Sequence, residues 1–374
     1  MKQTSEQHRL NLARIIAKVI IFLMIINFGW IAVPDRIIGQ LSLYNTLIRG
    51  RERFPFGENP QSANNLSIYN LEAMFSSHKI NERIREDTYK VFLVGDSSIW
   101  GFLQTPEQSL AGILDRRLEE QGISIYNLGY PSISVLKDLQ IIEIALRYEP
   151  DLVIWFTTLE ALPISQQIET PINQNNPENI NSLVEKYDLH DIEKQPDDPL
   201  QQTFWAKRRN IFDVLRLQLY GLLWDATGID QEYPEAYREA QRDFPDAEIT
   251  YKGFSDAQSL KDQLALDVII NGISKNSSTD FVLINEPVLI SQGENSTLRY
   301  NYYYPRWAFD AYREWMHQIT VENDIKYYDL WDVIPENEFT NSAIHLTPAG
   351  EEMLADHIIK IITNHMEESD RDVQ

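Results

Sequence analysis

Cysteine is absent from the 374-residue chain. Its absence excludes disulfide bonds, a thiolate nucleophile and cysteine-ligated zinc, and it is compatible with an oxidising compartment. Positive charge is also scarce, because 33 lysines and arginines stand against 56 acidic residues and give a formal net charge of −23. Such a surface repels phosphate backbones, so we predict no nucleic-acid partner. His, Asp and Glu do not cluster at metal-ligand spacing, and we predict neither a metal nor another cofactor.

Long apolar runs are equally rare, and only one is long enough to cross a bilayer. It extends from Ile15 to Val33 and is interrupted only by Lys18 and Asn27. A spanning helix needs about 20 such residues. A cleaved signal peptide is one alternative, although no A-x-A-like site follows the run, and a buried core helix is another. We interpret residues 15–33 as a transmembrane signal-anchor helix.

Basic residues flank this run on both sides, and the nearest ones favour a cytoplasmic N-terminus. Those that precede or enter the run are Lys2, Arg9, Arg14 and Lys18, and those that follow it are Arg36, Arg49, Arg51 and Arg53. The sequence therefore predicts a single-pass membrane protein with residues 1–14 in the cytoplasm and the main domain periplasmic or extracellular. Residues 34–88 are polar and irregular. We interpret them as a membrane-proximal connector that carries the domain away from the bilayer and packs partly on its surface.

Short apolar runs alternate with helical patterns from residue 89 onward. The runs are typical of strands that are covered on both faces, and they are Val91–Val94, Ser124–Leu128, Leu152–Phe156, Phe281–Ile284 and Ile325–Tyr328. Between the first two, a capping box from Thr105 to Gln108 predicts the start of a helix that ends at Gly122. The alternation predicts an α/β domain at residues 89–365 with three layers (α/β/α, flavodoxin-like) around a central parallel sheet. An acidic flexible tail is expected at residues 366–374.

The stretch from about residue 161 to 279 interrupts this alternation. Its first part, residues 171–199, is polar and loop-like, whereas its second part holds amphipathic segments near Phe212–Leu223 and Leu260–Ile273. We interpret the stretch as a largely helical insertion between strands of one sheet.

A serine follows the first predicted strand directly. Gly95, Asp96 and Ser97 make a tight turn from that strand into a helix. Ligands of open α/β sheets bind beyond the carboxyl ends of the strands, so the Ser97 hydroxyl is expected to be exposed there with its backbone N–H facing the ligand. Gly95 permits the sharp turn, and Asp96 is expected to support it. An ordinary Asp or Ser helix cap is the alternative interpretation.

Two further residues lie at comparable positions in the predicted fold. Gly129 follows the second strand, where a glycine N–H can donate to an oxyanion without steric cost, although an ordinary turn glycine is the alternative. His345 lies in a loop just before the last helix and far from Ser97 in sequence, which suits a general base. The other six histidines lie before the apolar run, in polar loops, or within or at the ends of predicted helices.

Together these elements resemble the SGNH/GDSL hydrolase superfamily. That family carries GDS after its first strand, a glycine after its second, G-x-N-D after its third and D-x-x-H before its last helix. The resemblance covers about residues 89–160 and 280–365. It implies Ser97 as the nucleophile, His345 as the general base, and the N–H groups of Ser97 and Gly129 as oxyanion donors.

The segment after the third strand departs from the family pattern. Leu159 or a neighbour stands where the family has its oxyanion asparagine. Thr157 or Thr158 is a candidate for the missing donor, with Thr158 preferred. Glu160 is either close to the site or a solvated loop acid.

The residues before the histidine depart as well. The family aspartate, three residues earlier, is replaced by Ser342, and Asn341 precedes it. Either neutral side chain can orient the imidazole, with weaker stabilisation of the imidazolium than an aspartate provides. Glu286, after the fourth strand, is similar to the acid of some glycosidases, but the second carboxylate that this chemistry needs is not evident.

The resemblance implies serine-dependent ester chemistry. We expect an O-acyl transferase or acyl esterase that acts on a cell-envelope glycan or a similar extracytoplasmic substrate, with an integral-membrane acyl-donor protein as a candidate partner. A lipolytic or deacetylating hydrolase with water as the acceptor is an alternative within the enzymes. A catalytically degenerate binding or assembly module at the membrane surface is the alternative outside them.

Overall fold

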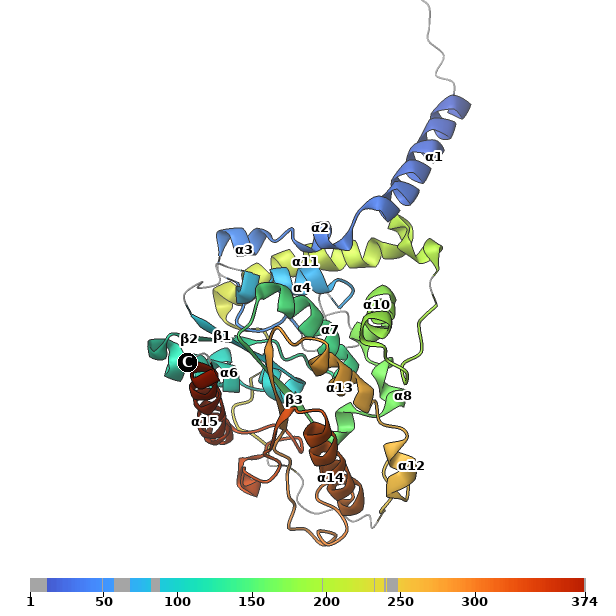
Figure 1. Ribbon diagram of the computed structural model, residues 1–374. Helices are drawn as coiled ribbons and strands as arrows, with labels where there is room; N and C mark the ends of the chain where they lie inside the picture. Colours follow the sequence, from blue (N-terminus) through green and yellow to red (C-terminus); the bar gives the residue numbers. More distant parts are fainter. Residues whose placement is uncertain are drawn as a thin grey trace, which may run out of the picture.

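A five-stranded, all-parallel sheet forms the centre of the fold (Figure 1). The computed structural model describes residues 12–48, 50–56, 68–81, 88–196, 198–231, 233–238, 240 and 248–372. The strand order is β2-β1-β3-β4-β5, and the strands are β1 (Tyr89–Val94), β2 (Ile123–Asn127), β3 (Leu152–Thr157), β4 (Asp280–Asn285) and β5 (Lys326–Asp329). Each lies within two residues of its predicted bounds. The predicted fold class is therefore confirmed.

Helices cover both faces of this sheet. Side chains alternate between the faces of a strand, so Phe92 and Val94 of β1 join one hydrophobic core while Val91 and Leu93 join the other. The first core is completed by α7 (Val135–Ala145), α13 (Leu266–Ser274) and α14 (Arg306–Glu322). The second is completed by α6 (Leu110–Leu118) and α15 (Pro348–Asp372). Two cores on either side of one sheet make the three-layer architecture.

Helix α6 begins later than the sequence predicts. The capping box at Thr105 and Gln108 is present, but it closes only a 3-10 turn at Pro106–Gln108. The backbone becomes extended again at Ser109, whose side chain accepts from Gly112 N and caps α6 at Leu110. The single helix start predicted from the sequence is therefore two separate starts, a 3-10 turn capped by Thr105 and then α6 capped by Ser109.

The insertion is helical throughout much of its length, as predicted. Its helices are α8 (Ile164–Gln167), α9 (Pro171–Gln174), α10 (Pro177–Tyr187), α11 (Phe204–Thr227), α12 (Ala257–Lys261) and α13. The loop-like interpretation of residues 171–199 is wrong for α9 and α10. Proline occupies the first turn of both helices, and α10 buries Ile180, Leu183 and Val184 on one face, so a polar composition concealed an amphipathic helix.

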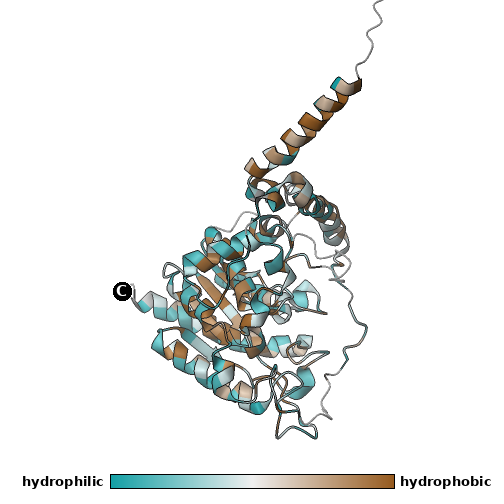
Figure 2. Ribbon diagram, turned by 90° about the vertical axis from the view of Figure 1, so that its right-hand side faces the viewer, coloured by the Kyte–Doolittle hydropathy of each residue, from teal (hydrophilic) through white to brown (hydrophobic). Residues whose placement is uncertain are grey.

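The apolar run near the start forms one exposed helix, α1 (Leu12–Gly29), which a 3-10 turn extends to Ala32. Figure 2 shows it projecting from the domain as a hydrophobic rod. Residues 12–32 are long and apolar enough to cross a membrane, and none of the helix is buried in the protein. The helix is thus a candidate membrane span by length and composition. Residues 1–11, with Lys2 and Arg9, lie outside the described residues, as does Arg49.

The connector is packed into the domain more closely than a spacer requires. It holds α2 (Asp35–Gly39), α3 (Leu43–Leu47) and α4 (Leu71–Ser76), and its residues 57–67 and 82–87 lie outside the described part. Phe54 is fully buried, and Phe56 packs edge-on against the rings of Trp100 and Tyr130. At the other end of the chain, the segment expected to be a flexible tail is helical as far as Asp372.

Candidate active site

The site lies at the topological switch point of the sheet. The chain passes from β1 to β2 at one edge of the sheet, and from β3 through β4 to β5 at the other edge, so the switch point lies between β1 and β3. Parallel sheets with this order bind ligands beyond the carboxyl ends of the two strands at the switch point. Ser97 follows β1 there, and Thr157 ends β3.

The turn after β1 presents Ser97 at the first position of a short helix, α5 (Ser97–Trp100). Asp96 caps this helix, because its Oδ1 accepts from Ser98 N at 2.8 Å. Gly95 is required by packing, since a Cβ at this position would lie 2.6 Å from the Ile99 side chain. The Ser97 N–H has no acceptor among the described residues, so it is available to a ligand.

His345 lies in direct contact with Ser97. The distance from Ser97 Oγ to His345 Nε2 is 2.8 Å. A tight loop carries the histidine, closed by a bridge between Phe339 and Leu346 and by Thr340 N donating to His345 O at 2.8 Å. The serine hydroxyl and the imidazole, 248 positions apart in sequence, are thus in direct contact, which is the arrangement that a nucleophile and a general base require.

Asn341 completes the relay, and Ser342 does not take part in it. The distance from Asn341 Oδ1 to His345 Nδ1 is 3.0 Å, whereas Ser342 Oγ accepts from Ile344 N within the loop. Because an amide oxygen accepts from Nδ1–H, this contact leaves Nε2 without a proton and able to accept from the Ser97 hydroxyl. The arrangement is Ser-His-Asn, in which a neutral amide occupies the place of the triad carboxylate.

The imidazole has one neighbour that the sequence analysis missed. The ring of Phe102 stacks on that of His345, with 5.0 Å between centroids and 30° between planes. Burial lowers the pKa of His345 to about 4. The histidine is therefore neutral at neutral pH, which is the form that a general base needs.

This lowered pKa predicts a pH–rate profile whose acid side falls at an unusually low pH. We expect kcat/KM for a small activated ester to stay near its plateau down to about pH 5 and to fall only as the pH approaches 4, where His345 becomes protonated. Asn341→Asp places a negative charge beside Nδ1 and should move the limb upward by about 1–3 pH units. A pH–rate profile of both proteins measures this. A wild-type limb near pH 7 would show that the pKa of His345 is not lowered by its surroundings.

Gly129 packs against the nucleophile helix. A Cβ on Gly129 would lie 2.5 Å from Trp100 N and 2.8 Å from the Ile99 carbonyl carbon, so any larger residue would displace α5. Its N–H donates to Asn127 Oδ1 at 3.0 Å. The role of Gly129 as an oxyanion donor stays a prediction, and its closeness to α5 gives a separate reason for glycine.

The candidates after β3 are bound to other parts of the protein. Thr158 Oγ1 lies 2.9 Å from Tyr304 OH. Thr157 Oγ1 is buried and has no hydrogen-bond partner among the described residues. Glu160 is neither solvated nor unpaired, because it forms a 2.6 Å ion pair with Lys252 and accepts from Tyr251 OH at 2.9 Å. Glu160 thereby joins the end of β3 to the insertion.

A cluster of buried charges supports the nucleophile turn from below. Lys137 is fully buried, pairs with Asp138, and donates to Gly95 O at 2.7 Å and to Tyr130 O at 3.2 Å. It thus ties the turns after β1 and β2 together. The signal in the sequence was a Lys-Asp pair in a mostly apolar helix.

Glu286 belongs to the same region as this buried cluster. Its Oε2 accepts from Ser98 Oγ at 2.6 Å, beside the nucleophile. Burial and the nearby Asp96 raise the pKa of Glu286 well above its usual range. Burial likewise raises the pKa of Asp96. A protonated Glu286 would avoid two buried negative charges beneath Ser97.

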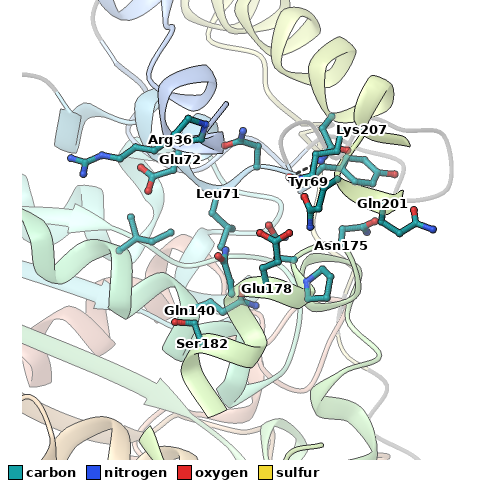
Figure 3. A pocket seen from close by; sticks show the side chains of 18 of the residues that line it. Arg36, Tyr69, Leu71, Glu72, Gln140, Asn175, Glu178, Ser182, Gln201 and Lys207 are labelled. Atoms are coloured by element: carbon teal, nitrogen blue, oxygen red, sulfur yellow. Dashed lines mark hydrogen bonds between the residues drawn. The ribbon is translucent and has the colours of Figure 1, made fainter. Parts of the chain in front are cut away.

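A pocket in the described part of the chain lies away from this site. It measures about 790 Å³ and lies where α2, α4, α7, α10 and α11 meet, lined by Arg36, Tyr69, Glu178 and Lys207 among others (Figure 3). Within the described residues, no group of three or more His, Asp or Glu side chains is placed to hold a metal ion.

Comparisons with known proteins find similar solved structures at low sequence identity. The chain matches no protein-family model and no curated protein sequence. Among solved structures, it is similar to a lipolytic protein of the G-D-S-L family from Veillonella parvula (10% identity, TM-score 0.36, 73% of this chain and 98% of that one). It is also similar to Est24, a carbohydrate acetylesterase from Sinorhizobium meliloti (12% identity, TM-score 0.34, 74% of this chain and 99% of that one). A third similar structure is the esterase EstA from Pseudoalteromonas sp. (10% identity, TM-score 0.38, 75% of this chain and 99% of that one). Identities this low do not transfer an activity.

Proposed function

We propose that this chain is a serine-dependent ester hydrolase or O-acyltransferase. The observation that carries the proposal is the Ser97–His345–Asn341 relay, with contacts of 2.8 and 3.0 Å at the carboxyl end of the sheet. A hydroxyl, a neutral imidazole and an acceptor that sets the tautomer are the groups that acyl transfer through a serine needs.

In the proposed reaction, Ser97 Oγ attacks the ester carbonyl while its proton passes to His345 Nε2. The oxyanion that forms is stabilised by the free Ser97 N–H, with Gly129 N–H as the second donor if it leaves Asn127. His345 then returns the proton to the departing alcohol, leaving an acyl-serine. Water or an acceptor hydroxyl, deprotonated by His345, attacks the acyl-serine and releases Ser97.

A glycan or similar acyl-bearing polymer outside the cytoplasm is the proposed substrate. A group of aromatic side chains joined to the end of β3 supports this choice. Tyr302 is exposed, and its ring centroid lies 4.1 Å from that of Tyr303. The Tyr303 ring centroid also lies 5.9 Å from that of Tyr304, whose hydroxyl is 2.9 Å from Thr158 Oγ1, just after β3. Flat aromatic faces suit the apolar faces of sugar rings.

A non-catalytic binding module is the second candidate. The site lacks the family's carboxylate and oxyanion asparagine, and the Gly129 N–H is already bonded to Asn127. Loss of one oxyanion donor lowers kcat by about 100- to 1000-fold in other enzymes. An integral-membrane acyl donor remains a proposed partner of the transferase form only.

Covalent labelling distinguishes these candidates. Full-length protein in detergent is treated with a fluorophosphonate and examined by intact mass and peptide mapping. We expect one adduct, on Ser97, that is lost in Ser97→Ala and in His345→Ala and kept in Ser274→Ala, which removes an exposed serine of α13. A wild-type protein that stays unlabelled at high probe concentration would favour the binding module.

A further inference from the structure

Three helices form one layer at the end of the molecule where α1 emerges (Figure 1). They are α2, α3 and α11, and we call this layer the platform. It is held together by contacts between segments far apart in sequence, since Gln218 Oε1 accepts from Leu43 N at 2.5 Å. The platform is also joined to α1, because Asn27 Oδ1 accepts from Trp205 N at 2.9 Å and the rings of Trp30 and Phe204 meet edge-on at 5.3 Å.

The outer surface of the platform is apolar. On α11, Phe212, Leu215, Leu219 and Leu223 recur every three or four residues and are 57–66% exposed, while Val214, Leu217 and Gly221 are buried on the inner face. Further large apolar side chains are at least 57% exposed around them: Ile37, Leu41, Leu43, Leu47, Leu200 and Trp205. An exposed apolar surface built from three helices marks a contact with lipid or with another protein.

We propose that this platform rests on the lipid bilayer, with α2, α3 and α11 lying in its interface. Continuity with α1 is the first argument, because the apolar surface adjoins the only candidate span in the described part of the chain. An apolar stripe that begins where a span ends is at the depth of the lipid headgroups and upper acyl chains. At about 1.5 Å per residue, the 24 residues of α11 would extend about 36 Å along that surface.

Charge and aromatic content are the second argument. Helix α11 carries four basic residues (Lys207, Arg208, Arg209 and Arg216) against two acidic ones, in a chain whose net charge is −23. Helices that lie in the interface combine an apolar face with basic residues that meet lipid phosphates. Trp30 and Trp205, at the junction of α1 and α11, are the residue type that collects at the level of the headgroups.

Docking of the platform would hold the active site at a constant orientation to the membrane. Just beyond α11, Asp230 accepts from Arg51 at 2.6 Å and from Arg53 at 2.7 and 2.8 Å. Arg53 in turn donates to the carbonyls of Gly101 and Gln104, which follow the nucleophile helix. The membrane-facing helix is therefore joined to the segment that carries Ser97 through buried ion pairs, without a flexible linker.

The absence of native cysteine makes a direct test possible. Single cysteines are introduced by Leu219→Cys and Leu47→Cys, labelled with an environment-sensitive fluorophore, and compared with Val321→Cys on α14, which is 68% exposed. Each full-length protein is reconstituted into phosphatidylcholine vesicles containing a lipid with a nitroxide on its upper acyl chain. We expect several-fold stronger quenching and a blue-shifted emission at positions 219 and 47 than at position 321.

Two outcomes would overturn the proposal. Equal and weak quenching at the three positions would show that the platform lies away from the bilayer. If the labels at positions 219 and 47 are exposed to water in pure lipid vesicles but shielded in native membranes, the surface contacts a protein partner instead of lipid. As a second measurement, Leu215→Ser with Leu223→Ser should lower the quenching at position 219 while leaving fluorophosphonate labelling of Ser97 intact. Both leucines are exposed, and the side-chain contacts among Ser97, His345, Asn341 and Phe102 involve no residue of α11.

Discussion

Ser97→Ala is expected to lower kcat for a small activated ester by about five orders of magnitude, or to background. The variant removes the only hydroxyl within reach of His345 Nε2 in the described site, at 2.8 Å. Nucleophile and base act as a unit, so His345→Ala should cost nearly as much, and the double variant little more than either. Steady-state kinetics with a chromogenic ester measures all three.

Ser274→Ala is the control for these kinetics. Ser274→Ala should retain wild-type kcat, because this serine is exposed on α13 and bonds only to Ile270 O of its own helix. A Ser97→Ala protein with activity within tenfold of wild type would exclude Ser97 as the nucleophile. A small residual rate is expected in any case, since binding and oxyanion donors alone accelerate such reactions.

Arg53→Ala is expected to destabilise the folded protein by about 3–5 kcal/mol, the usual cost of breaking a buried ion pair by removing one partner. Arg53 is 1% exposed and makes two bonds to Asp230. Although burial alone would raise the pKa of Asp230, the bonds and charges of Arg53 and Arg51 lower it. Removing Arg53 also leaves the carbonyls of Gly101 and Gln104 without this donor.

The same variant should impair catalysis through the position of His345. Arg53 holds the backbone of Gln104, and the Gln104 side chain donates to Leu346 O at 2.9 Å, next to the histidine. We therefore expect a lower kcat even below the unfolding transition. Urea unfolding of the full-length protein in detergent, with ester hydrolysis at low urea, measures both effects.

Arg116→Ala is the matched control. Arg116 pairs with Glu352 at 3.0 Å, but both side chains are about half exposed, and exposed pairs contribute about 0–1 kcal/mol. Arg53→Lys should recover only part of the loss, because an ammonium cannot reproduce the forked contact with Asp230. A cost of under 1 kcal/mol for Arg53→Ala would show that the connector does not support the fold.

Local patterns predicted the parts of the fold that depend on local physics. The five predicted runs became the five strands. Strands β1 to β4 are mostly buried, and a strand buried on both faces needs a continuous apolar sequence, whereas β5 contains Lys326 and has no buried residue. The turn at Gly95 to Ser97 was predictable for a similar reason, because ligand-binding residues of parallel sheets follow strand ends. Residues 171–199 show the limit, where polar composition concealed α9 and α10.

Groups that act through long-range contacts had little signal in the sequence. Arg53 meets Asp230 across 177 positions, and the sequence indicated only a basic residue in a connector. Lys137 was not singled out in the sequence, yet it is fully buried and donates to Gly95 O in the turn that carries Ser97. Phe102 followed the nucleophile segment without a pattern that would distinguish it from a core residue.

The sequence by itself determined the parallel sheet and the places of Ser97 and His345, because strand burial and the position of residues after strands are local properties. Only the tertiary structure decided that Asn341 and not Ser342 orients the histidine, because one residue of difference in a tight loop reverses the direction of a side chain. It likewise decided that Glu160 pairs with Lys252, whose position depends on how the insertion folds back on β3. Such contacts depend on the packing of distant segments, which no local pattern encodes.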